Sequence, residues 1–350
     1  MQRRDFIILA GSAALLSQVP LARAKEMAAG EAWRKFRLTY TINLLQQGND
    51  ANLWLPLPDN MADYQRVSDA DWLGRPDEAS FIRMGNVPAF FAHWQDATPR
   101  EVTVSVEVAT RDRMLGLRRN NPTAEDFNDA TQHYLQPTDA MPLDGIVHRT
   151  ALEAIQHATS PLQKARAIYD WVVDNTFREP AVKGCGRGDI KTMLETGNLG
   201  GKCADINSLF VGLCRAVGIP AREVYGIRVA ESRQFKSLGR AGDISKAQHC
   251  RAEFYLAEAG WVPVDAADVR KAVLEEKLPL DDAKIVALRE RLFGSWEMNW
   301  VAFNHDRDVA LNSRQKAGFF MYPCAEVAGE RCDSLNPESF SYNIEVQEVA

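Results

Sequence analysis

The sequence predicts an α+β protein in which a β-rich N-terminal region precedes a core of helices packed on an antiparallel sheet. Between residues 34 and 110, apolar and polar residues alternate with the period of two that is typical of half-buried strands. Between residues 160 and 218, apolar residues recur at helical spacing. Between residues 248 and 265, two short strand-like runs flank the turn AEAG and predict a hairpin.

The first 24 residues have the features of a twin-arginine export signal. Arg3 and Arg4 precede an apolar run over residues 6–19, and residues 22–24 make a small-x-small cleavage site. A membrane anchor is the competing interpretation, but the unbroken apolar part is shorter than the roughly twenty residues that span a bilayer. We therefore expect a periplasmic or secreted protein without stable membrane insertion.

The mature chain is acidic. Residues 1–24 carry three arginines and one aspartate, a net charge of +2, so their removal changes the formal charge of the chain from −6 to −8. Such a charge makes nucleic acid a poor candidate partner.

Residues 25–115 are expected to form a β-rich N-terminal domain. One face of each strand is apolar there, which predicts an antiparallel sandwich. The alternating positions are Phe36, Leu38, Tyr40, Ile42 and Leu44 in one strand, and Val102, Val104, Val106 and Val108 in another. Residues 116–145 have no clear periodicity and are expected to form a connector.

A helix is predicted from Pro161, with Ser160 as its N-cap. Its apolar stripe indicates core scaffold, and Trp171 is open to two interpretations, as a core residue or as part of a cleft wall. The stripe consists of Leu162, Ala165, Ile168, Tyr169 and Val172.

Cys203 is the strongest candidate for a nucleophile. It follows Gly200 and Gly201, which allow a close approach of substrate to the backbone, and it begins a helix that ends before Gly218. The free N–H groups and the positive dipole of a helix start favour a thiolate. The backbone N–H of Cys203 is also the best candidate oxyanion donor. The structural alternative is a small buried cysteine.

His249 and Asp265 are the expected base and its orienting group. If the apolar faces of the two hairpin strands coincide, the odd-numbered residues of both strands share the other face. His249 and Asp265 then lie within side-chain reach, whereas a register slip of one residue would separate them. In the loop over residues 184–201, Asp189 and Asn198 are candidate oxyanion groups or turn formers.

These segments resemble the transglutaminase-like superfamily, whose papain-like core carries a Cys, His, Asp triad in this chain order. The resemblance covers roughly residues 150–270 and rests on GKCADINSLFVGLCRAVGIPAR and GWVPVDAAD. It implies a catalytic core over residues 146–270, with Cys203 as nucleophile, His249 as base and Asp265 as orienting residue. Members commonly have Trp two residues after the histidine and Pro after the aspartate, where this chain has Arg251 and Ala266.

Six cysteines in an exported chain suggest a disulfide. Cys324 and Cys332 bracket a short loop and are the pair that we expect to bond. Cys203 and Cys214 would lie roughly 16 Å apart along one helix and cannot bond to each other. For Cys185 and Cys250 the sequence leaves open whether they take part in a disulfide. The sequence contains no CxxC pair or HExxH helix to support a zinc site.

Residues 271–350 regain strand character and are expected either to complete the catalytic sheet or to pack on the N-terminal domain. Trp296, Met298 and Trp300 share a strand face and are interpreted as core or as cleft wall. His305 is a rival base, although its surroundings of turn formers and charges favour a solvated loop.

The sequence thus predicts a thiol enzyme that performs acyl transfer or hydrolysis at an amide through a thioester on Cys203. The expected substrate is a peptide, protein or cell-wall amide, and no cofactor or metal is implied. The alternative is a non-catalytic module of the same fold that binds a peptide or a wall component. The oligomeric state stays open.

Overall fold

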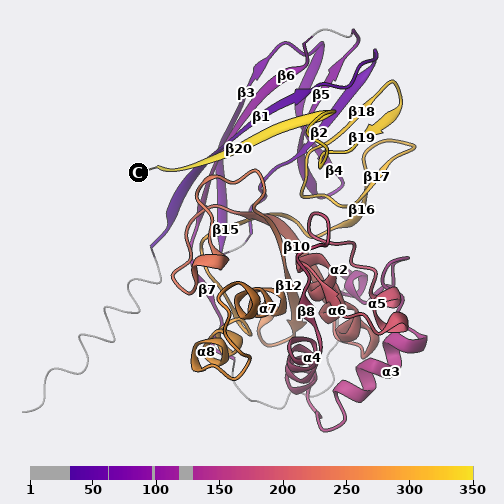
Figure 1. Cartoon of the computed structure of the whole chain (residues 1–350), viewed down its shortest axis with the longest axis vertical. Helices are drawn as coiled ribbons and strands as arrows, with labels where there is room; N and C mark the ends of the chain where they lie inside the picture. The colour runs from indigo at the N-terminus through magenta and orange to yellow at the C-terminus, as the bar shows by residue number, and fades with distance from the viewer. Residues whose placement is uncertain (1–31, 62, 97–98, 118–128, 350) are drawn as a thin grey trace, which may run out of the picture. The chain divides into compact units, whose positions relative to one another are not determined.

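The computed structural model describes residues 32–349 except residues 62, 97–98 and 118–128. The expected signal peptide, residues 1–24, and most of the central part of the expected connector lie outside the described residues. Figure 1 shows two parts within the described chain, a β-sandwich and a mixed region of helices around a sheet.

The β-sandwich consists of two five-stranded sheets. The first has the order β11-β20-β1-β6-β3, with bounds Gly242–Asp243, Phe340–Val349, Arg34–Leu44, Glu101–Thr110 and Gln65–Gly74. The second has the order β19-β18-β2-β5-β4, with bounds Glu330–Cys332, Cys324–Val327, Ala51–Pro56, Val87–Trp94 and Glu78–Met84.

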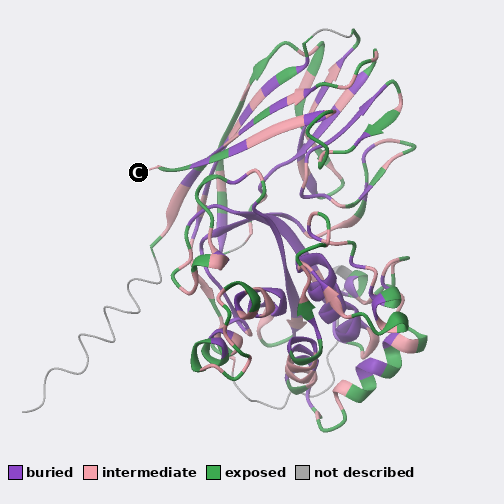
Figure 2. Cartoon of the chain, in the orientation of Figure 1, coloured by how far each residue is buried: buried purple, intermediate pink, exposed green. Residues whose placement is uncertain are grey.

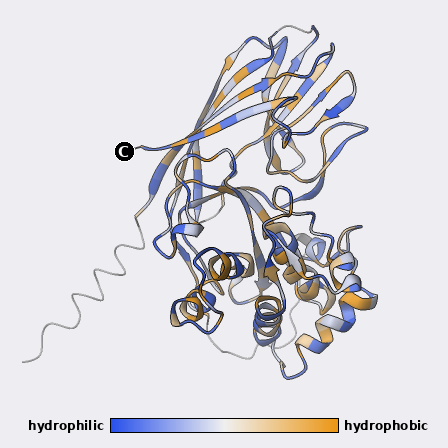
Figure 3. Ribbon diagram, in the orientation of Figure 1, coloured by the Kyte–Doolittle hydropathy of each residue, from blue (hydrophilic) through white to orange (hydrophobic). Residues whose placement is uncertain are grey.

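The alternation in the sequence predicts the buried face of the sandwich correctly. Every even-numbered residue from Phe36 to Leu44 of β1 is at most 4 % exposed, as is every even-numbered valine from Val102 to Val108 of β6. The two strands are antiparallel, and Leu38 lies opposite Val106. In Figure 3 the sandwich strands change between hydrophobic and hydrophilic colours along their length, as this pattern requires.

The second part of the chain is built on a four-stranded antiparallel sheet of order β13-β12-β10-β15. The bounds of these strands are Gly260–Val264, Gln248–Leu256, Ala221–Arg228 and Trp300–Asn304. Helix α6, Cys203–Ala216, packs on β10 and β12. This arrangement of helices on an antiparallel sheet confirms the predicted α+β class.

Helix α6 is more deeply buried than its stripe of apolar residues predicts. All residues from Cys203 to Arg215 are buried, because other helices cover the sides that the sheet leaves open. Figure 2 shows α6 and the sheet behind it almost entirely in the buried colour. The covering helices are α3 Gly145–Ala154, α4 Pro161–Asn175, α5 Ile190–Thr196 and α7 Ala266–Glu275.

Helix α4 begins as predicted, with Ser160 as its N-cap. The Ser160 hydroxyl accepts a hydrogen bond from the Gln163 N–H at 3.3 Å, and the Gln163 side chain accepts one from the Ser160 N–H at 3.2 Å. Its predicted stripe is buried. Trp171 is partly buried against the core and does not line the cleft described below.

The remaining elements are short, except helix α8. The helical ones are α2 Asp129–Gln132, η1 His133–Leu135, η2 Lys236–Leu238 and α8 Ala283–Arg291. The strand pairs are β7 Arg113–Met114 with β14 Ser295–Trp296, β8 Phe177–Arg178 with β9 Gly200–Gly201, and β16 Arg307–Ala310 with β17 Lys316–Phe319. No helix among the described residues is long and apolar enough to cross a bilayer.

Residues 271–350 contribute strands to both the core sheet and the sandwich, the two alternatives that the sequence leaves open. Strand β15 is an edge strand of the core sheet, whereas β18, β19 and β20 belong to the sandwich. Figure 1 shows the yellow strand β20 lying along the indigo strand β1, at opposite ends of the chain. The two termini of the described chain therefore share one sheet.

The predicted disulfide between Cys324 and Cys332 is wrong, and all six cysteines are free thiols. Cys332 lies opposite Ala325 in the pairing of β18 with β19. Because side chains alternate along a strand, Cys324 points to the other face of the sheet from Cys332. The two cysteines accordingly pack in different apolar clusters.

Candidate active site

Cys203 is the first residue of helix α6 and lines a cleft of ≈ 1000 Å³. Its side chain is nearly enclosed, with the residue 3 % exposed, so a substrate would reach the sulfur from the cleft. The two glycines before Cys203 have a different role from the predicted one, which is to allow a close approach of substrate. A side chain at Gly201 would meet Asp205 and one at Gly200 would meet the ring of Phe177, so internal packing requires these glycines.

Asp205 fixes the loop around the start of this helix. Its carboxylate accepts hydrogen bonds from the backbone N–H groups of Lys202, Arg187 and Gly188 at 2.9, 2.8 and 2.9 Å. The Ala204 N–H donates to the Cys185 carbonyl at 2.9 Å. The segment around Cys185 is therefore held against the first turn of α6.

His249 lies near the start of β12, and its Nε2 atom is 2.7 Å from Oδ2 of Asp265. Both residues are buried. In the hairpin, Glu253 lies opposite Pro263 and Tyr255 opposite Trp261, so odd-numbered residues face odd-numbered residues. This is the register from which we predict that His249 and Asp265 meet.

Asp265 also has the structural role that is common for an aspartate at the end of a strand, as a helix cap. Strand β13 ends at Val264, and Asp265 is the N-cap of α7, where its side chain accepts a hydrogen bond from the Asp268 N–H at 3.1 Å. The cap fixes one carboxylate oxygen and leaves the other toward His249.

Two further groups at the site are missing from the sequence analysis. Asn207 donates from its amide to Asp265 at 3.2 Å and to the Cys250 carbonyl at 2.9 Å. Asp268 is 3.4 Å from Nε2 of His249 and forms a buried ion pair with Arg228 at 2.6 Å. Asn207 could have been inferred, because it lies one helical turn after Cys203 on the same side of α6. Asp268 and Arg228 have no such local signal.

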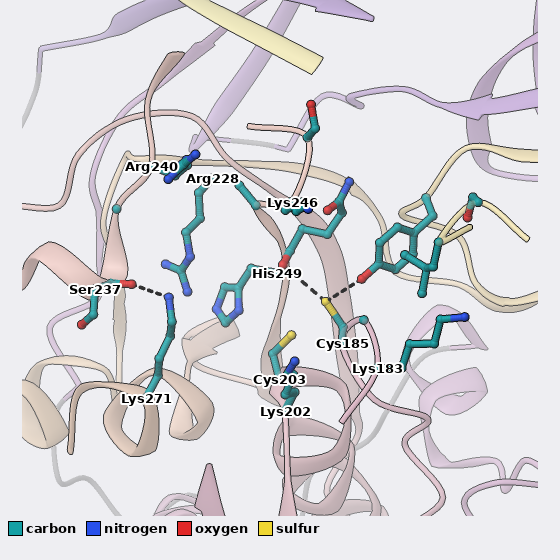
Figure 4. A pocket seen from close by; sticks show the side chains of 18 of the residues that line it. Lys183, Cys185, Lys202, Cys203, Arg228, Ser237, Arg240, Lys246, His249 and Lys271 are labelled. Carbon is teal, nitrogen blue, oxygen red and sulfur yellow. Dashed lines mark hydrogen bonds between the residues drawn. The ribbon is translucent and has the colours of Figure 1, made fainter. Parts of the chain in front are cut away.

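Cys185 also reaches the site. Tyr322 donates from its hydroxyl to Sγ of Cys185 at 3.1 Å, and Cys185 donates to the Gln248 carbonyl at 3.3 Å. Figure 4 shows the sulfur of Cys185 beside that of Cys203, with the ring of His249 on the other side of Cys203.

These neighbours favour a charged form of both Cys203 and His249. The neighbouring thiols of Cys185 and Cys250 hold the pKa of Cys203 well below that of an ordinary cysteine; His249 lowers it further, while burial opposes the shift. Burial and Arg228 act to lower the pKa of His249, but the carboxylates of Asp268 and Asp265 outweigh them and raise it above its usual value. The arrangement therefore favours a thiolate beside an imidazolium.

The backbone N–H of Cys203 has no hydrogen-bond acceptor among the described residues, as expected of a helix start. Asp189 and Asn198, the two side-chain candidates for an oxyanion site, have turn-forming roles instead. Asp189 caps α5 by accepting from the Thr192 N–H at 3.0 Å, and Asn198 accepts from the Gly200 N–H at 3.2 Å.

The other aromatic and histidine candidates lie outside the cleft. Trp296 and Trp300 are fully buried and Met298 is 4 % exposed, so the core interpretation holds for all three. His305 is not in a solvated loop, because it packs beside Tyr134, and burial lowers its pKa to about 4. It does not line the cleft that contains Cys203.

A family model described as the transglutaminase-like superfamily matches residues 149–266, the segment that contains this site. This segment belongs to the transglutaminase-like superfamily. An uncharacterized protein of Haemophilus influenzae is 40 % identical to it over 332 residues, which are 88 % of this chain and 89 % of that protein.

Several solved structures resemble the chain. A proposed cysteine protease from Cytophaga hutchinsonii has a TM-score of 0.58 at 16 % identity, and the match covers 91 % of this chain and 92 % of that chain. The periplasmic domain of TgpA from Pseudomonas aeruginosa has a TM-score of 0.35 at 17 % identity, covering 73 % and 92 % of the two chains. At 16 % identity the likeness to the Cytophaga hutchinsonii protein concerns the fold alone.

Arg251, which stands where members of the superfamily commonly have tryptophan, does not face the substrate cleft. Its guanidinium lies 4.7 Å from the ring of Trp300, and its Nε atom is 3.6 Å from Oδ2 of Asp265. Arg251 thus contacts the site from the side away from the cleft and is not among the residues that line the cleft.

His249, Asp265 and Asp268 are close enough together to be considered as metal ligands, since their donor atoms lie within 4.8 Å of one another. Their hydrogen bonds point to another use. Both oxygens of Asp268 bond to Arg228, and Asp265 bonds to Asn207 and to a backbone N–H. The carboxylates are thus held as partners of His249 and Arg228.

Proposed function

We propose that this chain is a thiol enzyme that attacks an amide carbonyl with Cys203 and passes the acyl group to an amine or to water. The observation that carries the proposal is the position of Cys203 at a helix start beside His249, whose Nε2 atom lies 2.7 Å from Asp265. A thiol, a base and an orienting carboxylate are the three groups that nucleophilic catalysis by cysteine requires.

In the first half of the reaction, the Cys203 thiolate adds to the carbonyl carbon of the bound amide. The oxyanion that forms can accept a hydrogen bond from the backbone N–H of Cys203. The imidazolium of His249 then gives its proton to the leaving nitrogen, the C–N bond breaks, and an amine departs. The products of this half are a thioester on Cys203 and a neutral His249.

In the second half, neutral His249 takes a proton from the incoming amine or water as that group adds to the thioester carbonyl. The C–S bond breaks, and the thiolate of Cys203 and the imidazolium are restored. Asp265 holds the ring through both halves, because its other oxygen is fixed by the cap of α7 and by Asn207. An amine acceptor gives transfer and water gives hydrolysis.

The substrate that we propose is an amide in a peptide, a protein or the cell wall. The N-terminal sequence supports a location outside the cytoplasm, because residues 1–24 have the pattern of a twin-arginine signal. Wall peptides and exported proteins are the amides that an enzyme in that compartment would meet.

The test is a screen of amide-bearing peptides and wall fragments with the intact protein and with Cys203→Ala. We expect released amine and a transient acyl adduct on the peptide containing Cys203, both lost in Cys203→Ala. Cys214→Ala is the matched control, because it removes a thiol from the same helix away from the cleft. Equal product from intact protein and Cys203→Ala would contradict the covalent mechanism, and binding without any product would favour a non-catalytic module.

A further inference from the structure

The cleft that contains Cys203 is basic although the chain as a whole is acidic. Its lining has eight lysines and arginines against two glutamates, whereas the whole chain has 41 basic and 47 acidic residues. A concentration of one charge sign in a cleft raises the local concentration of ligands with the opposite sign.

Most of these cations form no ion pair with a carboxylate of the described residues, although Asp243 acts on Arg240 and Lys246, and Glu276 on Lys236, at longer range. Three of them have carboxylate partners: Arg228 pairs with Asp268, Lys183 with Asp333 and Lys271 with Glu275. The other five have no carboxylate oxygen within 4.0 Å in the part of the chain that the structure describes. They are Arg178, Lys202, Lys236, Arg240 and Lys246.

The unpaired cations come from opposite sides of the reacting groups. Lys202 directly precedes Cys203, whereas Lys236, Arg240 and Lys246 belong to the segment between β10 and β12. Figure 4 shows Lys202 beneath Cys203, and Arg240 and Lys246 on the far side of His249. A ligand bound across Cys203 would pass between positive groups on both sides.

The segment that carries Arg240 and Lys246 is held in place by the sandwich. Its strand β11 pairs with β20, and the Ser245 hydroxyl accepts a hydrogen bond from the Ile344 N–H at 2.8 Å. The Arg240 Nε–H donates to the Asp243 carbonyl at 2.9 Å. The backbone that carries these two cations is therefore a fixed wall of the cleft.

We infer that the acyl donor is an acidic peptide, with carboxylates within a few residues of the amide that Cys203 attacks. The inference rests on the proposed function for the reacting amide, and on the unpaired cations for the charge of the residues around it. Carboxylate side chains would pair with Lys202 on one side of the sulfur and with Arg240 and Lys246 on the other.

The charge of the cleft can be measured without turnover by alkylating Cys203 with iodoacetate, an anion, and with iodoacetamide, which is neutral. The rate with iodoacetate is divided by the rate with iodoacetamide, and this ratio is divided by the same ratio for glutathione. The normalised ratio no longer depends on the intrinsic reactivity of the thiol and reports the local potential. We expect a normalised ratio of at least about fivefold at low ionic strength, approaching one at about 0.5 M salt. A ratio of one or less at low salt would overturn the inference.

Charge reversal tests which residues are responsible. Lys246→Glu should lower the normalised ratio by about twofold or more, whereas Lys284→Glu should leave it unchanged. Lys284 is the matched control because it is exposed on α8, outside the cleft, and has no ion pair among the described residues. If the two variants have equal ratios, the positive potential at Cys203 does not come from Lys246, and the assignment of the ligand-binding cations is wrong.

The substrate class is tested by binding to the folded Cys203→Ala variant. Three fluorescent peptides carry one glutamine flanked by glutamates, by serines or by lysines, and their Kd values are measured by anisotropy. The glutamate peptide should bind at least about tenfold more tightly than the lysine peptide at low salt. Equal affinities, or tighter binding of the lysine peptide, would overturn the inference. If the glutamate peptide binds but intact protein forms no acyl adduct, the proposed function fails and the anion-binding site remains.

Discussion

At the scale of single residues, the account depends on how a few polar groups fix the charge of Cys203 and His249. The carboxylate of Asp265 is held by the cap of α7 and by Asn207, so that one oxygen faces the imidazole. Asp268 adds a second negative group at 3.4 Å. The thiols of Cys185 and Cys250 stabilise the thiolate of Cys203.

Asp265→Asn should lower the pKa of His249, because it removes a negative charge next to the ring and keeps an oxygen for the cap. The imidazole titration, followed by NMR, measures this change. The control is Asp281→Asn, an exposed aspartate without an ion pair among the described residues, which should leave the titration unchanged. An unchanged pKa in Asp265→Asn would show that Asp265 does not stabilise the imidazolium.

The sequence predicts the meeting of Cys203, His249 and Asp265 because each position follows from a local pattern: a helix start, a strand parity and a strand end. The contributions of Arg228 and Asp268 could not be predicted in this way, since they depend on how β10 packs against α7. The expectation for Cys324 and Cys332 considered only the short loop between them and neglected the alternation of side chains along a strand.

At the scale of elements, helix α6 is the structure on which the site is built. It is buried on all sides, and its first turn is connected to the preceding loop through Asp205. The periodicity of the sequence predicts this helix but not its complete burial, because α3, α4 and α7, which lie further away in the sequence, cover it together with α5.

Asp205→Ala should destabilise the protein by more than about 2 kcal/mol, because three backbone N–H groups lose their acceptor in a buried place. It should also slow the alkylation of Cys203, since the loop that carries Cys185 is released. Asp189→Ala is the comparison variant; it removes the cap of α5 from the same loop and should cost about 1 kcal/mol without changing alkylation. Urea unfolding and alkylation rates distinguish the two, and equal alkylation in both variants would contradict the role of Asp205.

At the scale of the whole described chain, the sandwich and the catalytic core are connected by buried polar contacts. Gln65 of β3 exchanges two hydrogen bonds with the backbone of Ala302 in β15, at 2.7 and 2.8 Å. The carboxylate of Glu253 in β12 pairs with Arg222 of β10 and with Arg113 of β7, the short strand that directly follows the sandwich strand β6. Sequence periodicity predicts each sheet, but it contains no information on these connections.

Glu253→Gln should destabilise the protein by about 3 kcal/mol, because two arginines would lose a buried partner. Burial acts to raise the pKa of Glu253, but Arg222 and Arg113 outweigh it and lower the pKa to about 2. Because the pKa is lowered on folding, the stabilisation is present above the unfolded value of about 4.3 and is lost as the pH falls toward about 2.

The measurement is urea unfolding of intact protein, Glu253→Gln and Glu258→Gln between about pH 7 and pH 3. The gap between intact protein and Glu253→Gln should narrow as the pH falls. Glu258 is the matched control, since it is exposed in the turn of the same hairpin. A gap that stays constant with pH would contradict the ion-pair account.

The most direct test of the central claim is the pH dependence of Cys203 alkylation by iodoacetamide, followed by mass spectrometry of the peptide that contains Cys203. The account predicts a midpoint well below the value of about 8.5 for a free thiol, and a higher midpoint in His249→Ala. A midpoint at or above about 8.5 in the intact protein, unchanged in His249→Ala, would contradict the thiolate–imidazolium pair.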